Sequence, residues 1–199
     1  ASGQAQFQKG AFDEAAATFS YMSRLYASQP DVYGVARAWL ARCYSHLDWL
    51  YDAEDVLRNM NRDSIHYLAQ PAWNQTMADY CLRTGQLEEA VPFLRKVIRR
   101  EHRKTQKARE WFIMGQILTS LGRTQDAYKA YNRVARQNPP YEMEFNARIA
   151  QTEVMATGAA AAKKMISRLK RMAASDNNKD YLDQVYYAIG NIWLVQNDN

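Results

Sequence analysis

The stretch that decides the fold is Trp111-Phe112-Ile113-Met114-Gly115-Gln116-Ile117-Leu118, which is followed by Gly122-Arg123-Thr124-Gln125-Asp126-Ala127 and then by Tyr131. Its large residues recur at intervals of three and four, which places their side chains on one face of a helix. Gly115 and Ala127 are small residues at which two helices can approach each other closely. Gly122 marks a turn between the two helical segments. The stretch therefore predicts two helices that pack as a hairpin.

The hairpin pattern is repeated along the chain, as a Gly or Asp, an alanine shortly after it, and a large residue four positions beyond the alanine. Steps of 38, 37 and 37 residues separate the marker alanines, which are Ala15, Ala53, Ala90 and Ala127. A small residue stands 12 positions before each marker, at Gly3, Ala41, Ala78 and Gly115. A fixed period of this kind is typical of tetratricopeptide (TPR) repeats, whose helical hairpins stack into a solenoid. We therefore predict an all-α fold, an α-solenoid of TPR-type hairpins.

The predicted solenoid is a single domain over residues 1–199, with about five repeats. The fifth copy is degenerate, with its turn at Gly158, and the sixth copy supplies only a first helix around Gly190. We expect the chain to start inside one repeat and to stop inside another, as a fragment of a longer solenoid. Pro30 marks a turn between repeats, and Pro71 and Pro92 suit the first turns of helices. The approximate repeat boundaries are 1–30, 31–70, 71–103, 104–140, 141–177 and 178–199.

The composition limits the class of protein. Hydrophobic residues make up 47% of the 199 residues, which is enough for a sizeable core. No apolar run approaches the roughly 20 residues that cross a bilayer, and residues 1–4 do not resemble a signal peptide. Cys43 and Cys81 are too few for a disulfide framework, and their places in adjacent first helices predict buried thiols.

The chain is basic, with a net charge of +5. Seven cations between residues 95 and 107 have two interpretations: a solvated helix end, where cations suit the helix dipole, or a surface for an anionic partner. Nucleic acid is not expected as a partner, because most aromatic residues fall at repeat positions that need bulk. The possible anionic-partner patch consists of Arg95, Lys96, Arg99, Arg100, Arg103, Lys104 and Lys107.

The sequence offers no constellation of residues for catalysis. His46, His66 and His102 stand 20 and 36 residues apart, so no pair has the i, i+4 spacing of a metal site on one helix. No glycine-rich phosphate-binding loop occurs. Paired acids such as Glu88 and Glu89 begin a helix, where negative charge suits the dipole. We therefore expect a non-enzymatic protein without a cofactor or a bound metal.

A protein-binding groove is the remaining candidate site. In TPR folds the first helices of the repeats line the concave face, where a segment of a partner lies. The second, fifth, ninth and twelfth places of each repeat point into that groove, and here they carry the mixed polar and aromatic residues of a recognition surface. A solvated groove would explain the same residues. The predicted groove residues are Arg42, Gln75, Asp79, Phe112, Gln116, Gln151, Tyr187 and Asn191.

Several stretches go beyond the generic repeat: residues 39–44 with 51–57, residues 141–151 and residues 178–192. The most specific parts are Phe145-Asn146-Ala147-Arg148 and Lys179-Asp180-Tyr181-Leu182-Asp183-Gln184, because the TPR pattern does not require them. These stretches resemble the large TPR lipoprotein of the type IX secretion and gliding-motility machinery of Bacteroidota, of the PorW or SprE type. The resemblance covers nearly the whole chain.

This resemblance implies an outer-membrane lipoprotein whose repeats face the periplasm. It implies a role in protein export through the type IX apparatus, by contact with its ring and translocon components. It also implies a lipid-bearing cysteine upstream of residue 1, because neither Cys43 nor Cys81 follows a lipoprotein signal. Two alternatives stay open: a soluble cytoplasmic adaptor or cochaperone, and an α-solenoid that binds nucleic acid.

Overall fold

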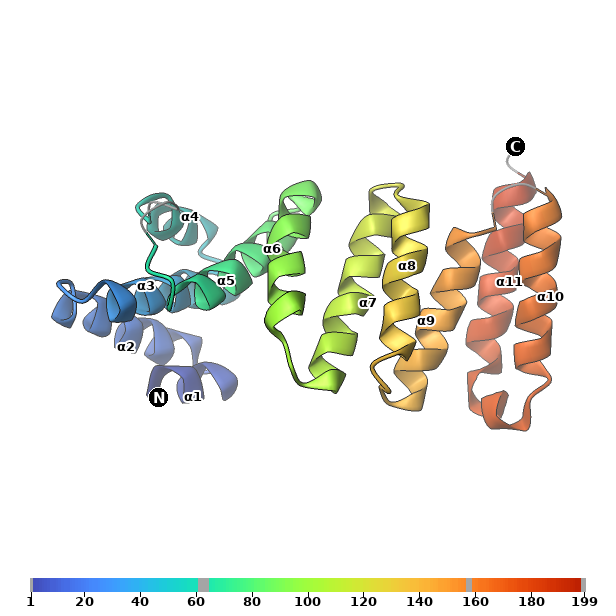
Figure 1. The fold of residues 1–199 in the computed structure, drawn as a ribbon, viewed down its shortest axis with the longest axis horizontal. Coiled ribbons are helices and arrows are strands. Elements are labelled where there is room, and N and C mark those ends of the chain that lie inside the picture. The colour runs from blue at the N-terminus through green and yellow to red at the C-terminus, as the bar shows by residue number, and fades with distance from the viewer. Residues whose placement is uncertain (1, 61–64, 157–158, 198–199) are drawn as a thin grey trace. The chain divides into compact units, whose positions relative to one another are not determined.

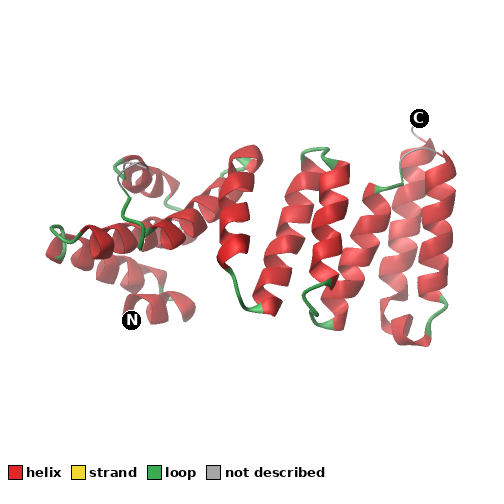
Figure 2. Ribbon diagram, viewed as in Figure 1, coloured by secondary structure: helices red, strands yellow, loops and turns green. Residues whose placement is uncertain are grey.

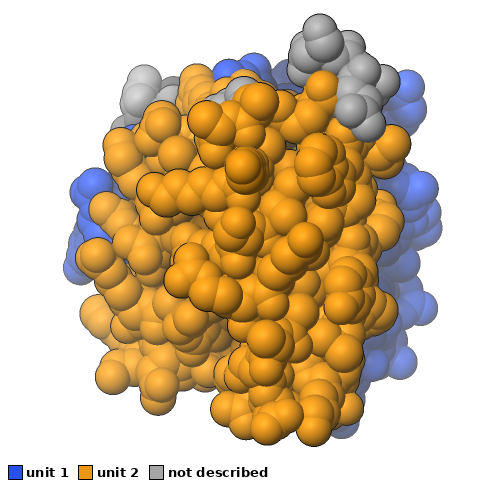
Figure 3. Space-filling model, turned by 90° about the vertical axis from the view of Figure 1, so that its right-hand side faces the viewer, with its two compact units in different colours: residues 1–100 blue, residues 101–199 orange. Residues whose placement is uncertain are grey.

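In the computed structural model, which describes residues 2–60, 65–156 and 159–197, every regular element is a helix (Figures 1 and 2). The chain divides into two compact units, unit 1 at residues 1–100 and unit 2 at residues 101–199, which Figure 3 colours separately. The helices of unit 1 are α1 (Ser2–Gln8), α2 (Phe12–Leu25), α3 (Pro30–His46), α4 (Leu50–Arg58), α5 (Gln70–Arg83) and α6 (Leu87–Arg100). Those of unit 2 are α7 (Lys104–Ser120), α8 (Thr124–Ala135), α9 (Tyr141–Val154), α10 (Ala159–Ala173), the 3₁₀ helix η2 (Asp176–Tyr181) and α11 (Leu182–Asn197).

Within each unit, successive helices pack as hairpins. In unit 1, α1 packs on α2, α3 on α4 and α5 on α6, and α3 also contacts both α2 and α5. In unit 2, α7 packs on α8, α8 on α9 and α10 on α11, and Figure 1 shows these helices side by side. None of the described helices is long and apolar enough to cross a membrane. The predicted all-α solenoid fold is confirmed, whereas the continuity of a single domain over both units stays a prediction.

The turns inside four hairpins are closed in the same way. Gly10, Asp48, Gly85 and Gly122 have positive φ angles of 82°, 63°, 73° and 70°, a backbone region that glycine enters without steric cost and that Asp tolerates. The next residue in each turn donates its backbone N–H to the carbonyl five positions earlier, over 2.8 to 3.0 Å, as in a Schellman motif. This geometry explains why the repeated pattern begins with Gly or Asp. Gly158, the expected turn of the fifth hairpin, lies outside the described residues.

The small residues of the pattern lie beneath its large residues. All four marker alanines are fully buried. A Cβ atom placed on Gly3 would lie 2.8 Å from the Phe19 ring, and one placed on Gly115 would lie 2.5 Å from the Tyr131 ring. In both cases the aromatic residue follows 16 positions after the glycine, so one hairpin in each unit uses the same contact. The absence of a side chain on the glycine therefore sets how closely the two helices approach.

Unit 2 has a further contact that the repeat pattern does not require. Tyr181, at the end of η2, packs against the rings of Tyr141 and Phe145 on α9, with centroids 6.1 and 4.9 Å apart. The Tyr141 hydroxyl donates a hydrogen bond to the side-chain carbonyl of the buried Asn178. The Asn178 amide in turn donates to the backbone carbonyl of Met172 at 2.7 Å. The start of α9 is thereby tied to the segment that precedes α11.

The prediction of a proline in the first turn of a helix is confirmed for Pro71 and is wrong for Pro92. Pro30 and Pro71 lie in the first turns of α3 and α5, where a missing N–H costs no helical hydrogen bond. Pro92 lies inside α6 instead. The reason is that α6 already begins at Leu87, directly after the closed turn at Gly85, so that Pro92 falls beyond the first turn.

Alanine substitutions at two glycines of the same repeat place should have opposite effects. Gly115→Ala should lower the free energy of unfolding by about 1–3 kcal/mol, because the new Cβ overlaps the buried Tyr131 ring. Gly190→Ala should leave it unchanged or raise it by up to about 1 kcal/mol, because a Cβ there has no atom within 4 Å and alanine favours the helix. Urea unfolding followed by circular dichroism measures both. Equal effects would contradict the position of Gly115 beneath Tyr131.

Candidate protein-binding site

A charged cluster lies across two first helices of unit 1, α3 and α5. Two of its members, Arg42 and Asp79, are predicted groove residues, and the other two are His46 and Arg83. Asp79 Oδ2 lies 3.3 Å from His46 Nε2 and 3.4 Å from Arg83 Nε. Arg83 Nη2 lies 3.1 Å from His46 Nδ1. With its proton on Nε2, a neutral imidazole donates to Asp79 and accepts from Arg83, so both ring nitrogens are used.

Arg42 is held in this cluster by aromatic rings. Its guanidinium carbon lies 5.1 Å from the ring centroids of both Phe7 and Trp39, which is a cation–π arrangement. Burial lowers the pKa of Arg42, and the nearby Asp79 carboxylate opposes that shift. The Nε atom is buried and has no hydrogen-bond partner among the described residues. Packing, and not a hydrogen bond at this atom, therefore positions the cation.

His46 joins the charged cluster to the same aromatic packing. Its ring centroid lies 4.7 Å from that of Phe7 and 4.8 Å from that of Phe12. Burial lowers the pKa of His46, the Asp79 carboxylate opposes this shift, and the positive charge of Arg83 adds to it. The imidazole therefore stays neutral at pH values where an ordinary histidine is partly protonated.

The cluster presents charges of both signs to solvent. The side chains of His46, Asp79 and Arg83 are 21%, 26% and 37% exposed. A half-exposed set of this kind can exchange hydrogen bonds with a bound segment while its own contacts keep the side chains in place. The arrangement is thus suited to recognition of a polar or charged stretch of a partner.

The groove prediction missed His46 and Arg83, although the 37-residue spacing of the repeat could have pointed to them. Asp79 follows Arg42 by 37 residues, and Arg83 follows His46 by 37 residues, which is one repeat step. Residues one step apart lie on neighbouring first helices, so they come together when the helices stack. Gln75, which is also a predicted groove residue, lies half-buried on α5 with Asp79.

The predicted groove residues of unit 2 differ in their surroundings. Phe112 is half-buried and packs edge-to-face on Tyr131, with centroids 5.6 Å apart. Gln116 is exposed. Asn191 is half-buried and donates a hydrogen bond to Glu153 Oε1 at 3.2 Å. These residues do not form a hydrogen-bonded cluster comparable to that of unit 1.

The prediction of an open groove position is wrong for Gln151, whereas binding by the exposed Tyr187 stays a prediction. The side chain of Gln151 is only 6% exposed, and its amide donates to the backbone carbonyl of Tyr128 on α8 at 3.3 Å. Gln151 therefore ties α9 to α8. It lies in the degenerate fifth copy, where few marker residues fix the alignment of the helix face. Tyr187 is 73% exposed on α11.

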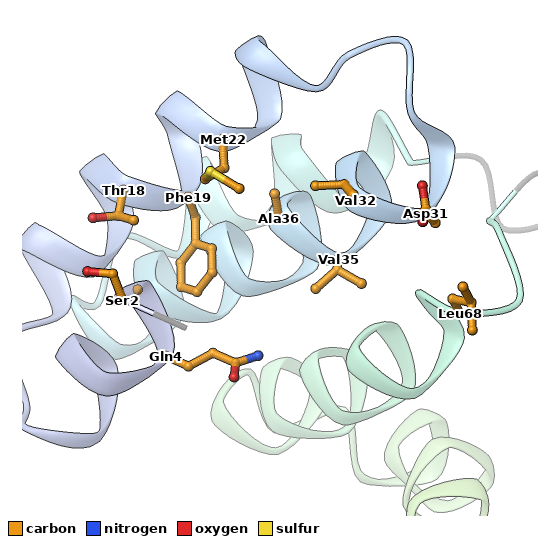
Figure 4. Close-up of a pocket in the computed structure, with 11 residues that line it drawn as sticks. Ser2, Gln4, Thr18, Phe19, Met22, Asp31, Val32, Val35, Ala36 and Leu68 are labelled. Atoms are coloured by element: carbon orange, nitrogen blue, oxygen red, sulfur yellow. The ribbon is translucent and has the colours of Figure 1, made fainter.

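Unit 1 also contains an apolar pocket that the sequence pattern does not reveal (Figure 4). It has a volume of about 470 Å³ and is bounded by α1, α2, α3 and Leu68, which lies shortly before α5. Figure 4 shows Phe19 from α2 and Val35 from α3 facing this space. The Phe19 ring also packs over Gly3, so the repeat pattern explains why a large residue is present at position 19 even if the pocket binds nothing. The lining suits an aliphatic or aromatic side chain.

The predicted anionic-partner patch is divided between the two units. Four of its cations are exposed on α6 in unit 1, namely Arg95, Lys96, Arg99 and Arg100. In unit 2, Arg103 donates to Glu101 at 3.1 Å, and this hydrogen bond holds the pKa of Glu101 below its ordinary value. Lys104 and Lys107 lie in the first turn of α7. Binding of an anionic partner by this patch stays a prediction.

Both cysteines are buried free thiols, as predicted. Burial raises the pKa of Cys43 to about 12 and that of Cys81 to about 11, which suppresses the reactive thiolate form. Within the described ranges, no three His, Cys, Asp or Glu side chains are grouped so that they could hold a metal ion.

Comparison with known proteins points to the same repeats. Residues 74–101 and 108–141 match the family model of the tetratricopeptide repeat. No curated protein matches the chain. The first matched segment covers most of α5 and all of α6 and includes Asp79 and Arg83, and the second covers most of α7 and all of α8. TPR repeats are typical of non-catalytic scaffolds with extended binding surfaces, so they indicate a protein–protein interaction scaffold.

The stability of the chain should depend on pH through His46. Its pKa in the folded chain is lower than the ordinary value of about 6.5, so the unfolded chain binds the proton more readily. This stabilisation is present above that ordinary value and is lost below it. The free energy of unfolding should therefore fall between about pH 7.5 and about pH 5.5, on either side of the ordinary pKa.

His46→Gln should weaken this dependence, because glutamine keeps hydrogen-bonding groups near Asp79 and Arg83 and does not titrate. Urea unfolding midpoints of both proteins at the two pH values measure the difference. If the midpoints shift equally with pH in the two proteins, then the protonation of His46 is not linked to folding.

Proposed function

We propose that the chain is the periplasmic TPR domain of an outer-membrane lipoprotein that is needed for type IX protein secretion. In this function it is a non-catalytic scaffold that contacts ring and translocon components of the secretion machinery. Its membrane attachment is an N-terminal lipid anchor outside this sequence. The proposal joins two parts, a binding activity and a cellular setting, which are supported by different observations.

The charged cluster of unit 1 is the observation that carries the binding part. His46 on α3 lies 3.3 Å from Asp79 and 3.1 Å from Arg83, both on α5. Asp79 and Arg83 pair with each other at 3.4 Å, and the Asp79 carboxylate acts electrostatically on Arg42. The cluster is half-exposed and includes residues of a segment that matches the TPR model. Charged side chains that are already oriented by their neighbours lose little conformational entropy when a partner binds.

The type IX setting is supported by the resemblance of residues 141–151 and 178–192 to the lipoprotein of that machinery. The two stretches contact each other in unit 2, through the Tyr181 ring and the hydrogen bond between Tyr141 and Asn178. The residues that the TPR pattern does not require thus have a packing role of their own.

Affinity capture from a bacterial envelope tests this proposal. The 199-residue chain is immobilised, a detergent extract of an envelope that carries type IX secretion is passed over it, and the bound proteins are identified by mass spectrometry. We expect enrichment of ring or translocon components. Recovery of cytoplasmic chaperones or nucleic acid in their place, or of none of these components, would contradict the proposal.

A matched pair of arginine variants tests the part that the cluster plays. Arg83→Ala should reduce the capture of ring or translocon components roughly tenfold, which corresponds to about 1.4 kcal/mol of binding free energy. Arg58→Ala is the control, because Arg58 on α4 forms the same kind of i, i+4 pair, with Glu54. Equal capture by the two variants would place the binding surface away from the cluster.

A further inference from the structure

The outer side of α10 in unit 2 is lined by cations. This helix carries five of them and no acidic residue. Four are exposed and Arg168 is half-exposed. At 100° per residue they spread over roughly half of the helix circumference, opposite the buried residues Ala162, Ile166 and Leu169. We call this side the cationic face, which consists of Lys163, Lys164, Arg168, Lys170 and Arg171.

The charge of this face is not neutralised by the described residues around it. The ion pairs of unit 2 join residues outside α10, such as Arg148 with Glu144 and Lys179 with Asp176. Residues 1–100 carry eleven cations and eleven acids, whereas residues 101–199 carry fifteen cations and ten acids. The whole net charge of +5 thus belongs to unit 2, and α10 carries as many cations as that excess. Like charges on one face repel each other, and an anionic partner relieves this repulsion.

The other second helix of unit 2, α8, repeats three of these cations at the same places. Ala162 follows the marker Ala127 by 35 residues, and both are buried. Three exposed cations of α8 and its C-terminal end precede three cations of α10 by the same step, namely Lys129 before Lys164, Arg133 before Arg168 and Arg136 before Arg171. Lys129 pairs with Asp126, and the guanidinium carbon of Arg133 lies 4.4 Å from the centroid of the Trp111 ring. The cations of α10 have no such contacts with described residues, so α10 is the main candidate for binding.

The stacking of the repeats leaves the cationic face accessible. In unit 2, α8 packs on α7 and α9, and α10 packs on α9 and α11, whereas α8 and α10 do not pack on each other. The second helices of this unit therefore stack through the first helices, with their outer sides unused. A further hairpin that stacked in the same way would lie on α11 and leave the outer side of α10 open.

We propose that the cationic face of α10 binds the surface of a membrane that contains anionic phospholipids. Such a surface presents many mobile anionic headgroups, so it can match long, flexible Lys and Arg side chains without a fixed arrangement of partners. Each cation close to it raises the affinity roughly fivefold. The apolar side of α10 is used in the protein core. The helix therefore lies on the headgroups by electrostatic attraction and does not insert its apolar side as a free amphipathic helix does.

Other anionic partners fit this face less well. The helix contains no aromatic residue, no Asn and no Gln. Single-stranded nucleic acid is usually held by stacking on aromatic rings, and base edges in duplexes are often read by amide side chains. The central contacts of a protein interface are commonly large side chains in dry pockets, and the only apolar residues exposed on α10 are alanines.

Co-sedimentation of the 199-residue chain with vesicles tests this proposal. The vesicles contain phosphatidylcholine alone or together with about one third of phosphatidylglycerol. We expect binding to the anionic vesicles only, and loss of that binding when salt is raised from about 0.05 M to about 0.5 M, because salt screens exposed charges. The vesicles contain no protein, so the outcome does not depend on the proposed role in secretion.

Two sets of matched variants locate the contact. Replacing Lys163, Lys164 and Arg168 by glutamine should weaken vesicle binding at least about tenfold. The same change at three exposed cations of unit 1 removes equal charge and should weaken it less than about twofold, namely at Lys9, Arg24 and Arg58. Ser167→Glu puts one negative charge at the centre of the face and should weaken binding roughly fivefold or more. Its control is Ala17→Glu on the exposed side of α2. Circular dichroism verifies that each variant is folded.

Three results would overturn the proposal. Equal binding to both kinds of vesicle, or binding to neither, would show that the face does not recognise anionic headgroups. Equal losses in the variants of α10 and in their controls would show that net charge acts without this face. Tighter binding of duplex DNA or of polyglutamate than of the anionic vesicles, at equal salt and equal anionic charge, would assign the face to nucleic acid or to an acidic protein.

Discussion

The contact on which the rest of the structure depends is an aromatic ring that lies over a glycine of the preceding helix. Gly115 and Tyr131 form it in unit 2, and Gly3 and Phe19 form it in unit 1. Because a Cβ atom would lie within 3 Å of the ring, the contact fixes both the spacing and the rotation of the two helices. The marker alanines, which are fully buried, hold the second helix against its neighbours in the same way. Close approach at small residues, repeated with a constant period, thus determines which residues face outward.

The charged cluster of unit 1 follows from this spacing. Two residues one repeat step apart occupy the same place on neighbouring first helices, so stacking places the Asp79 carboxylate where it acts on the Arg42 charge and brings His46 to Arg83. The aromatic residues around Arg42 then remove part of its water, which strengthens the attraction between the cation and the ring faces. A recognition surface of this kind needs no loop of its own, because the helices that make up the core also orient the side chains that a partner meets.

Much of this arrangement is predictable from the sequence, and the misses have identifiable causes. The markers are predictable because each is a small or a large residue at a constant interval, and the structure places them in contact. The role of His46 is missed when each histidine is considered alone, because its partners Asp79 and Arg83 belong to the next repeat. Gln151 is assigned to the wrong face, since the degenerate fifth copy has too few markers to fix the rotation of α9. The pocket beside Phe19 has no sequence signal, because a hollow depends on how several side chains fill space together.

The four closed turns determine where this protein can change its length during evolution. Every hairpin keeps 12 residues from its small residue to its marker alanine, yet the step from Ala15 to Ala53 is one residue longer than the two that follow. The additional residue therefore falls outside the closed turns. An insertion beside Gly85 would displace the hydrogen bond from Gln86 to Cys81 and rotate Ala90 by about 100° around its helix, away from its neighbour. The connections between hairpins, such as residues 26–29 and 136–140, escape this constraint, so related chains should gain and lose residues there while their hairpins keep a constant length.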